Sequence, residues 1–297
     1  MTAFRLIKEI PCKNLLGEGV QWNHQDQSFW WTDIKSNTLF RFHVESEKLD
    51  SWRMPENLGC FAFVIDSDEV LLGLASGYAW FNPSTGAIKW IAKPEVHWVG
   101  NRFNDGRVDR QGRFWVGSIT EQKNAEEQSA GLFCLNTQQQ VSQHLSGLRI
   151  SNSLCWNLSG NCLYHADSPS HQIQAYDFDV DAGTLSAPRV FATTPEGIEP
   201  DGACVDAQDH VWNAQWGSFE VVRYTPAGDI DTRLRLPVKQ PTCVAFGGNK
   251  LNLLAVTSAS IGLDEQSLVD QPSAGNLFIF ETDYQGVEES WYRCEKE

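Results

Sequence analysis

Residues 104–115 of the chain read NDGRVDRQGRFW. A polar turn, residues 109–112, separates a short run ending at Val108 from the apolar pair Phe114-Trp115, which opens the next run. A polar turn between two short apolar runs is typical of neighbouring antiparallel strands. The same arrangement recurs along the chain, and its spacing is informative.

Five further apolar pairs each follow a polar turn, and successive pairs lie 41, 44, 49, 48 and 42 residues apart. A second strand-like run often follows each pair after about ten to twenty residues. Six units with a period in the forties predict an all-β fold, a six-bladed β-propeller with four-stranded blades around a central channel. A two-domain β-sandwich array would not explain six evenly repeated turns. The pairs are Phe29-Trp30, Val70-Leu71, Phe114-Trp115, Leu163-Tyr164, Val211-Trp212 and Leu253-Leu254.

A propeller ring has no internal domain boundary, so we expect residues 1–297 to form a single domain. The ring must also close. The segment Phe4–Ile10 is short and compatible with a strand. We therefore expect it to pair with the last blade.

The composition limits the possible partners. The chain has 297 residues, with 38 Asp and Glu against 23 Lys and Arg, which gives a formal net charge of −15. Binding to nucleic acid or to an anionic membrane needs a basic face, so this balance argues against both. No apolar run is long enough to span a membrane, and the first residues do not resemble a signal peptide. We expect a cytoplasmic protein whose eight cysteines are free, mostly buried thiols.

Polar residues occupy matching positions ahead of four of the six apolar pairs. Glu18 and Asn152 lie 11 residues before their pairs, and Asn104 and Asp201 lie 10 residues before theirs. In a propeller this position falls at the start of the innermost strand, so the four side chains should converge at one end of the channel.

Two carboxylates and two amides are costly to bury together unless a cation offsets their charge. Oxygen ligands suit Ca²⁺, Mg²⁺ or Mn²⁺, and carboxylates also accept Zn²⁺ or Fe²⁺. The pattern therefore predicts a site for one divalent cation. For any one of these residues alone, turn formation is the competing interpretation.

Four motifs surround these residues: Leu16-Gly17-Glu18-Gly19, Asn101-Arg102-Phe103-Asn104-Asp105-Gly106, Ile150-Ser151-Asn152-Ser153 and Pro200-Asp201-Gly202. Taken together, they resemble the senescence marker protein (regucalcin) and gluconolactonase family, in particular its bacterial sugar lactonase branch. The resemblance runs in order over essentially the whole chain. It implies a six-bladed propeller with one divalent cation at its axis.

The resemblance also implies roles for individual residues. The direct cation ligands would be Glu18, Asn152 and Asp201. The substrate-side residues would be Arg102, Asn104, Asp105 and Glu121, with Asn104 close to the cation as well. Three positions depart from the family pattern: Val20, Ser153 and Ser260 stand where relatives often have Pro, Gly and Arg. The first two departures bear on backbone stiffness, and the third bears on the identity of the substrate.

The implied activity is the opening of a sugar (aldono-) lactone to the aldonic acid. A divalent cation would polarise the lactone carbonyl, and Asp201 would serve as both ligand and general base. Arg102 would donate hydrogen bonds to sugar hydroxyls. Two other functions stay open, namely a calcium-binding or scaffold propeller without catalysis and a hydrolase of other esters. An apolar mouth would favour the latter.

Three further expectations concern the rim and the surface. Trp98 and Trp216 are candidates for stacking on a sugar face, with core or rim packing as the alternative. The polar segment 121–130 is interpreted either as a solvated loop or as a lid over the channel. The acidic pairs Glu126-Glu127 and Glu288-Glu289 are expected to be solvated surface.

Overall fold

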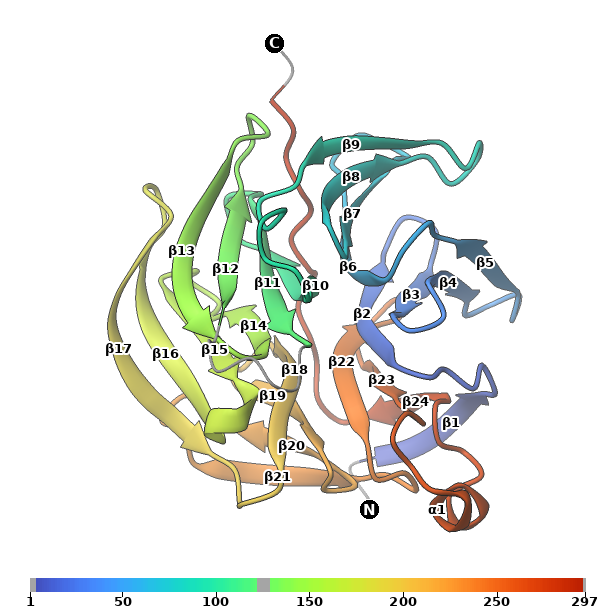
Figure 1. Cartoon of the computed structure of the whole chain (residues 1–297). Coiled ribbons are helices and arrows are strands. Elements are labelled where there is room, and N and C mark those ends of the chain that lie inside the picture. The colour runs from blue at the N-terminus through green and yellow to red at the C-terminus, as the bar shows by residue number, and fades with distance from the viewer. Residues whose placement is uncertain (1–3, 122–128, 296–297) are drawn as a thin grey trace.

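The computed structural model describes residues 4–121 and 129–295. Its strands form six four-stranded antiparallel sheets, which surround a common axis as the blades of a propeller (Figure 1). The only helices in the described part of the chain are α1 (Glu265–Asp270) and the 3-10 helix η1 (Ser168–Ser170). The prediction of an all-β, six-bladed propeller is confirmed.

Each blade is built from the axis outward. The innermost strands are β2 (Gly17–Asn23), β6 (Leu58–Phe63), β10 (Asn101–Val108), β14 (Ser151–Trp156), β18 (Glu199–Val205) and β22 (Pro241–Gly247). The second strands are β3 (Ser28–Asp33), β7 (Val70–Leu74), β11 (Phe114–Thr120), β15 (Cys162–Asp167), β19 (Val211–Trp216) and β23 (Leu253–Ser258). Every one of the six predicted apolar pairs lies on a second strand.

The outer half of each blade follows the same order. The third strands are β4 (Thr38–His43), β8 (Gly77–Phe81), β12 (Ala130–Leu135), β16 (Gln172–Asp179), β20 (Glu220–Tyr224) and β24 (Leu277–Thr282). The outermost strands are β5 (Leu49–Arg53), β9 (Ile88–Ala92), β13 (Val141–Leu148), β17 (Thr184–Thr193), β21 (Ile230–Arg235) and β1 (Phe4–Ile10). We number the blades 1 to 6 in the order of their innermost strands.

Burial decreases from the axis to the rim. All residues of β3, β6 and β14 are buried, because inner strands pack between neighbouring blades on both faces. The outermost β17 is mostly exposed. The largest fully buried side chains include Trp31, Trp115 and Trp212, which lie on second strands. Burying an aromatic side chain of this size contributes about 2–3 kcal/mol to stability.

The acidic residues of the repeated turns have a structural role. Asp109 accepts the backbone N–H groups of Gln111 and Arg113 with one oxygen and the indole N–H of Trp115 with the other, at 2.8 Å. Asp206 repeats this arrangement in blade 5, where its second oxygen accepts the indole N–H of Trp212 at 2.9 Å. The turn is therefore tied to the core tryptophan that follows it.

The ring closes as predicted. β1 pairs antiparallel with β24 from Phe4↔Thr282 to Ile10↔Leu277 and becomes the outermost strand of blade 6. The sheet of the last blade is thus made from both ends of the chain.

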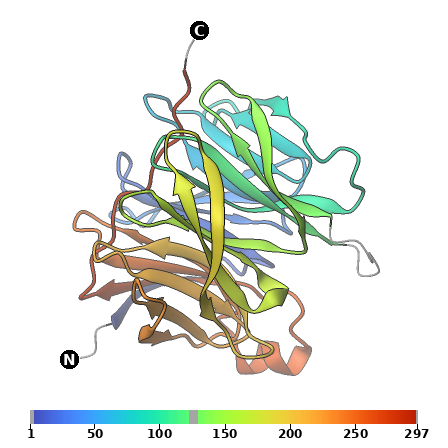
Figure 2. The same ribbon diagram turned by 90° about the vertical axis from the view of Figure 1, so that its left-hand side faces the viewer.

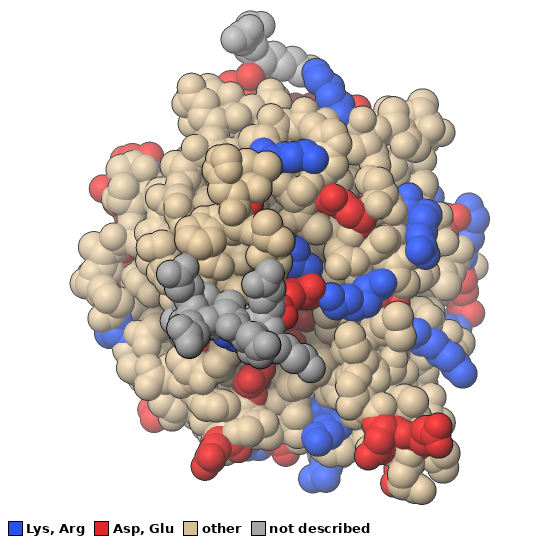
Figure 3. Space-filling model, viewed as in Figure 1, with Lys and Arg blue, Asp and Glu red and all other residues tan. Residues whose placement is uncertain are grey.

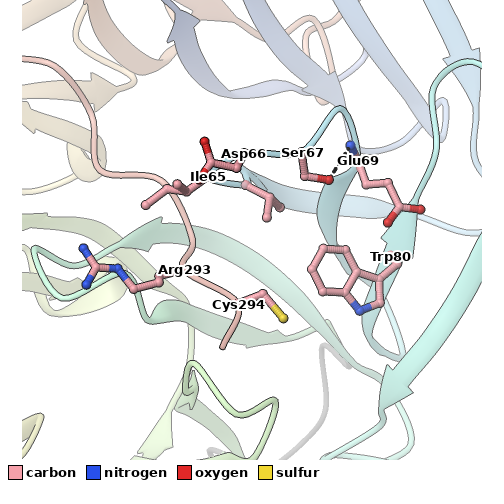
Figure 4. Close-up of a pocket in the computed structure, with 8 residues that line it drawn as sticks. Ile65, Asp66, Ser67, Glu69, Trp80, Arg293 and Cys294 are labelled. Atoms are coloured by element: carbon pink, nitrogen blue, oxygen red, sulfur yellow. Dashed lines mark hydrogen bonds between the residues drawn. The ribbon is translucent and has the colours of Figure 1, made fainter. Parts of the chain in front are cut away.

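The segment after β24 crosses the face of the ring opposite α1 (Figures 1 and 2). Backbone hydrogen bonds join Gln285 to Ala207 in blade 5, Tyr292 to Phe63 in blade 2, and Arg293 to Gly112 in blade 3. A groove of about 750 Å³ lies between this tail and blade 2, where Trp80, Glu69 and Cys294 line it (Figure 4).

This tail contradicts one surface prediction. Glu288 is exposed, as expected, but Glu289 is half-buried and lines a cavity of about 20 Å³ together with Arg107. The carboxylate of Glu289 helps to raise the pKa of Arg107, against the effect of burial. The expectation of a solvated Glu289 was wrong because the tail folds back across the end of the channel.

All eight cysteines are free thiols, and six of them are buried, as predicted. Among the described residues, no helix is long and apolar enough to cross a membrane.

Candidate active site

Each innermost strand changes register against its neighbour near its start. The shift falls between Glu18 and Gln21 in β2, and between Pro200 and Ala203 in β18. Corresponding shifts occur in β10 and β14. A bulge interrupts the alternation of side chains and re-aims them. As a result, the four residues predicted from the repeat face one cavity at the axis. They are Glu18, Asn104, Asn152 and Asp201.

This cavity has a volume of about 170 Å³. Polar side chains line it together with apolar ones such as Ile119, Ile150 and Trp216. Five of the seven predicted site residues line it: Glu18, Arg102, Asn104, Asn152 and Asp201. Basic and acidic side chains meet near the centre of the face shown in Figure 3.

A chain of hydrogen bonds connects the rim to the axis. Lys35 Nζ and Arg102 Nε both donate to Glu121 Oε1, at 2.5 and 2.6 Å. Arg102 Nη1 donates to Asn104 Oδ1 at 2.8 Å, and Asn104 Nδ2 donates to Asn152 Oδ1 at 2.9 Å. The guanidinium and the two amides are therefore held in a fixed order, and each amide has a defined orientation.

Glu18 and Asp201 are buried acids without a cationic partner. Neither carboxylate takes part in an ion pair with another described residue, and Asp201 Oδ1 accepts no hydrogen bond there. Burial, together with the charge of Asp105, raises the pKa of Glu18 to about 8. Burial and the neighbouring Glu18 raise the pKa of Asp201 well above its ordinary value. Two adjacent buried carboxylates favour protonation of one or binding of a cation.

The backbone carbonyl of Asp201 is held by one side chain of the neighbouring blade 4 and one of its own blade 5. Ser153 Oγ donates to Asp201 O at 2.6 Å, and Asn213 Nδ2 donates to the same carbonyl at 2.8 Å and to Ser153 Oγ at 3.1 Å. Ser153 has φ +63°, a region that favours glycine. Its hydroxyl supplies a cross-blade hydrogen bond that glycine lacks, which gives the departure from the family pattern a physical reason.

Blade 2 contributes no side chain to the site. At the matching position of β6 stands Gly59, where a Cβ would lie 2.5 Å from Phe103 O and 2.7 Å from Asn104 O. The absence of a side chain lets β10 approach closely and brings Asn104 to the axis.

Two predicted residues lie outside the cavity lining. Both oxygens of Asp105 accept backbone N–H groups, from Gly106 at 2.9 Å and Leu154 at 3.0 Å. Glu121 lies at the rim, bonded to Arg102 as described. Their roles toward a sugar stay predictions.

Other rim positions are also placed by the structure. Trp98 is 49% exposed and does not line the cavity, whereas Trp216 does. Ser260 Oγ donates to Asn14 O at 2.8 Å, outside the cavity lining, and Val20 is fully buried. Most of the segment interpreted as a loop or lid, residues 122–128, lies outside the described residues, as does the acidic pair Glu126-Glu127.

Ser168 and Glu199 line the cavity but were not predicted. Ser168 begins η1, which follows a second strand, so it has no counterpart at the repeated offset. Glu199 lies two residues before Asp201 and is the first residue of β18. Only its proximity to the Pro200-Asp201-Gly202 motif could have indicated it.

A family model for the SMP-30/Gluconolactonase/LRE-like region matches residues 16–260. The chain belongs to this family. The match contains all four motifs, and the family assignment made from the sequence is confirmed.

Relatives within the SMP-30/gluconolactonase family include lactonases. The chain is 36% identical to an L-arabinolactonase of Azospirillum brasilense, over 93% of this chain and 91% of that protein. It is 30% identical to a 6-deoxy-6-sulfogluconolactonase of Pseudomonas putida, over 93% and 94%. The structure is similar to that of a calcium-binding protein, regucalcin, from Agrobacterium tumefaciens, with a TM-score of 0.91, 28% identity, and coverage of 97% and 98%.

The site residues fit a divalent cation. Asp201 Oδ1 has no partner among the described residues, and Glu18 and Asp201 bring two negative charges that no described cation pairs. Asn152 Oδ1 accepts one hydrogen bond and keeps a second lone pair. No group of three or more His, Cys, Asp or Glu within residues 4–121 and 129–295 is arranged to hold a metal. The predicted donor set differs from such a group because its third member is an amide.

Proposed function

We propose that this protein is a divalent-cation-dependent hydrolase that opens a sugar lactone to its aldonic acid. The unpartnered Asp201 carboxylate beside Glu18, in a cavity lined by polar and apolar side chains at the axis, is the observation that carries the proposal. The lactonase relatives support a lactone as the substrate class.

Glu18, Asn152 and Asp201 would hold the cation. When bound, it would polarise the lactone carbonyl and offset the charge that develops on the carbonyl oxygen. Asp201 Oδ1 accepts no other hydrogen bond from a described residue, so it can take a proton from the attacking water. Without a cation, the raised pKa of Asp201 favours the protonated form, which cannot act as a base. Asp201 would therefore be ionised, and able to act as a base, only when the cation is bound.

Arg102 positions the substrate. Its Nε and Nη1 donate to Glu121 and Asn104, so the guanidinium plane is fixed at the cavity wall. A fixed guanidinium is suited to donate to sugar hydroxyls in a defined direction. The polar groups of Arg102 and Asn104 favour a polyhydroxylated ester, whereas the apolar side chains of the walls suit the alternative, a hydrolase of other esters.

The test is hydrolysis of an aldonolactone panel, followed with a pH indicator and corrected for spontaneous opening. The protein is first stripped with a chelator and then supplied with Ca²⁺, Zn²⁺, Mn²⁺ or Mg²⁺. We expect turnover with at least one cation, and a loss of at least about 100-fold in Asp201→Ala. Asp283→Ala, at an exposed aspartate, is the matched control.

Three outcomes would contradict the proposal. Full activity after chelation would refute cation dependence. A folded Asp201→Ala variant with the wild-type rate would refute the role of Asp201. Cation binding without turnover on any lactone would favour a calcium-binding propeller, a function supported by the similarity to the calcium-binding regucalcin structure.

A further inference from the structure

Ser168 links the two blades that carry Asn152 and Asp201. It is 1% exposed, lines the cavity and begins η1 in the connection after β15 of blade 4. Asn152 Nδ2 lies 2.9 Å from Ser168 Oγ. Ser168 Oγ in turn lies 2.7 Å from Pro200 O, the carbonyl of the residue before Asp201.

The direction of these two hydrogen bonds follows from counting protons. A serine hydroxyl has one proton to donate. The Pro200 carbonyl can only accept, so that proton points to Pro200 O. Ser168 Oγ must then accept from Asn152, which requires the Asn152 NH₂ group to face Ser168 and the Asn152 oxygen to face away.

The other side of the Asn152 amide agrees with this direction. Asn104 Oδ1 accepts from Arg102, so Asn104 presents its NH₂ group to Asn152 Oδ1 at 2.9 Å. Asn152 is therefore held from both ends. Of the two contacts, only the one through Ser168 reaches the backbone of blade 5, one residue from Asp201.

We propose that Ser168 is a positioning residue that holds Asn152 and Asp201 in the arrangement that binds a divalent cation. The proposal rests on the proposed function, since it concerns the same cation site. Ser168 itself is not a ligand in this proposal. Its hydroxyl ties the amide of one ligand to the main chain of the other, which fixes the two donors relative to each other before the cation arrives.

The experiment compares cation binding by the metal-free wild type, Ser168→Ala and Ser170→Ala, using calorimetric titration with Ca²⁺ and with Mn²⁺. Ser170 belongs to the same 3-10 helix but is exposed, so its variant is the matched control. We expect Ser168→Ala to weaken binding by about 10–100-fold, as is typical when a group that orients a metal ligand is removed. Ser170→Ala should bind like the wild type.

A second measurement separates positioning from a general structural role. Because Ser168→Ala loses two buried hydrogen bonds, the metal-free variant should unfold at a lower temperature than the wild type. A positioning role predicts in addition that added cation raises the melting temperature of the wild type more than that of the variant, whereas a purely structural role predicts equal rises. Ser168→Thr, which keeps the hydroxyl, should restore most of the affinity. If Ser168→Thr does not fold, the comparison of Ser168→Ala with Ser170→Ala still decides.

The outcomes distinguish this inference from the proposed function. A wild type that binds neither cation refutes both. A wild type that binds, together with a Ser168→Ala variant whose affinity is within twofold of it, overturns the role of Ser168 alone and leaves the lactonase proposal standing. Equal weakening in Ser170→Ala would also overturn it, because the effect would then belong to the helix as a whole.

Discussion

Replacing Asp201 with asparagine is expected to stabilise the metal-free protein at pH 8, although most substitutions of buried residues destabilise. Asp201 and Glu18 are 5% and 9% exposed, and no ion pair with a described residue offsets either charge. At pH 8 the metal-free folded protein must hold one of these carboxyls protonated or bury two like charges side by side, which costs about 2–4 kcal/mol. The asparagine amide removes that cost, nearly preserves the side-chain volume, and can donate a hydrogen bond to Glu18.

The effect should depend on pH in a defined direction. Burial raises the pKa of Glu18 from 4.5 to about 8 and raises the pKa of Asp201 well above 3.8. The folded protein therefore binds these protons more tightly than the unfolded chain does. The contribution of these two groups to metal-free stability is therefore fully present only below their ordinary pKa values, and it is lost as the pH rises through the raised values. The benefit of Asp201→Asn should be largest at pH 8 and clearly smaller at pH 5.

The assay is thermal unfolding of chelator-treated protein at pH 5 and pH 8. For a chain of this size about 1 kcal/mol corresponds to about 2 °C, so the melting temperature at pH 8 should rise by about 4–8 °C. A divalent cation at about 100 times its Kd should stabilise the wild type by about 2.7 kcal/mol and the variant by less.

Asp206→Asn is the matched control. Asp206 is buried like Asp201, but it pairs with Arg223 at 2.7 Å and accepts from Trp212. Breaking a buried ion pair costs about 3–5 kcal/mol, so this variant should melt lower at both pH values. A lower melting temperature for Asp201→Asn at pH 8, or an equal gain at pH 5 and pH 8, would refute the reasoning.

Three other substitutions test the surroundings of the site. Arg102→Lys keeps the charge but loses hydrogen bonds of the guanidinium to Glu121 and Asn104. We therefore expect kcat/KM for a lactone to fall about 10–100-fold with little change in melting temperature, and wild-type kinetics would contradict this. Lys35→Ala removes one of two hydrogen-bond donors to Glu121, so steady-state kinetics should show KM raised about two- to fivefold at unchanged kcat. A large loss of kcat would assign Lys35 a different role. Asn213→Ala removes two buried hydrogen bonds, and denaturant unfolding should show a loss of about 2–3 kcal/mol; unchanged stability would argue against their contribution.

The repeat in the sequence was sufficient to predict the architecture and the convergence of four polar side chains on one cavity. The six apolar pairs lie on second strands because the period of one blade is set by four strands and their turns. Glu18, Asn104, Asn152 and Asp201 reach one cavity because residues at equal offsets occupy equivalent places in different blades.

Residues whose positions do not follow the repeat could not be placed in the same way. Ser168 lies in a 3-10 helix that has no counterpart in the other blades within the described residues. Asp105 is next to Asn104 in sequence, yet its oxygens bind backbone groups of Gly106 and Leu154, because the bulge in β10 sets the direction of each side chain. Glu289 was expected at the surface because nothing in its sequence indicates that the tail returns across the ring.

The closing strand has a consequence for the order of events during synthesis. β1 is synthesised before the other strands of the ring, but its partner β24 lies about 270 residues later in the chain. At the usual rates of translation of about 5–20 residues per second, about 15–50 s pass before that partner exists. During this interval one edge of the nascent chain stays unpaired and the ring stays open, so blade 6 is completed only after release of the C-terminal segment.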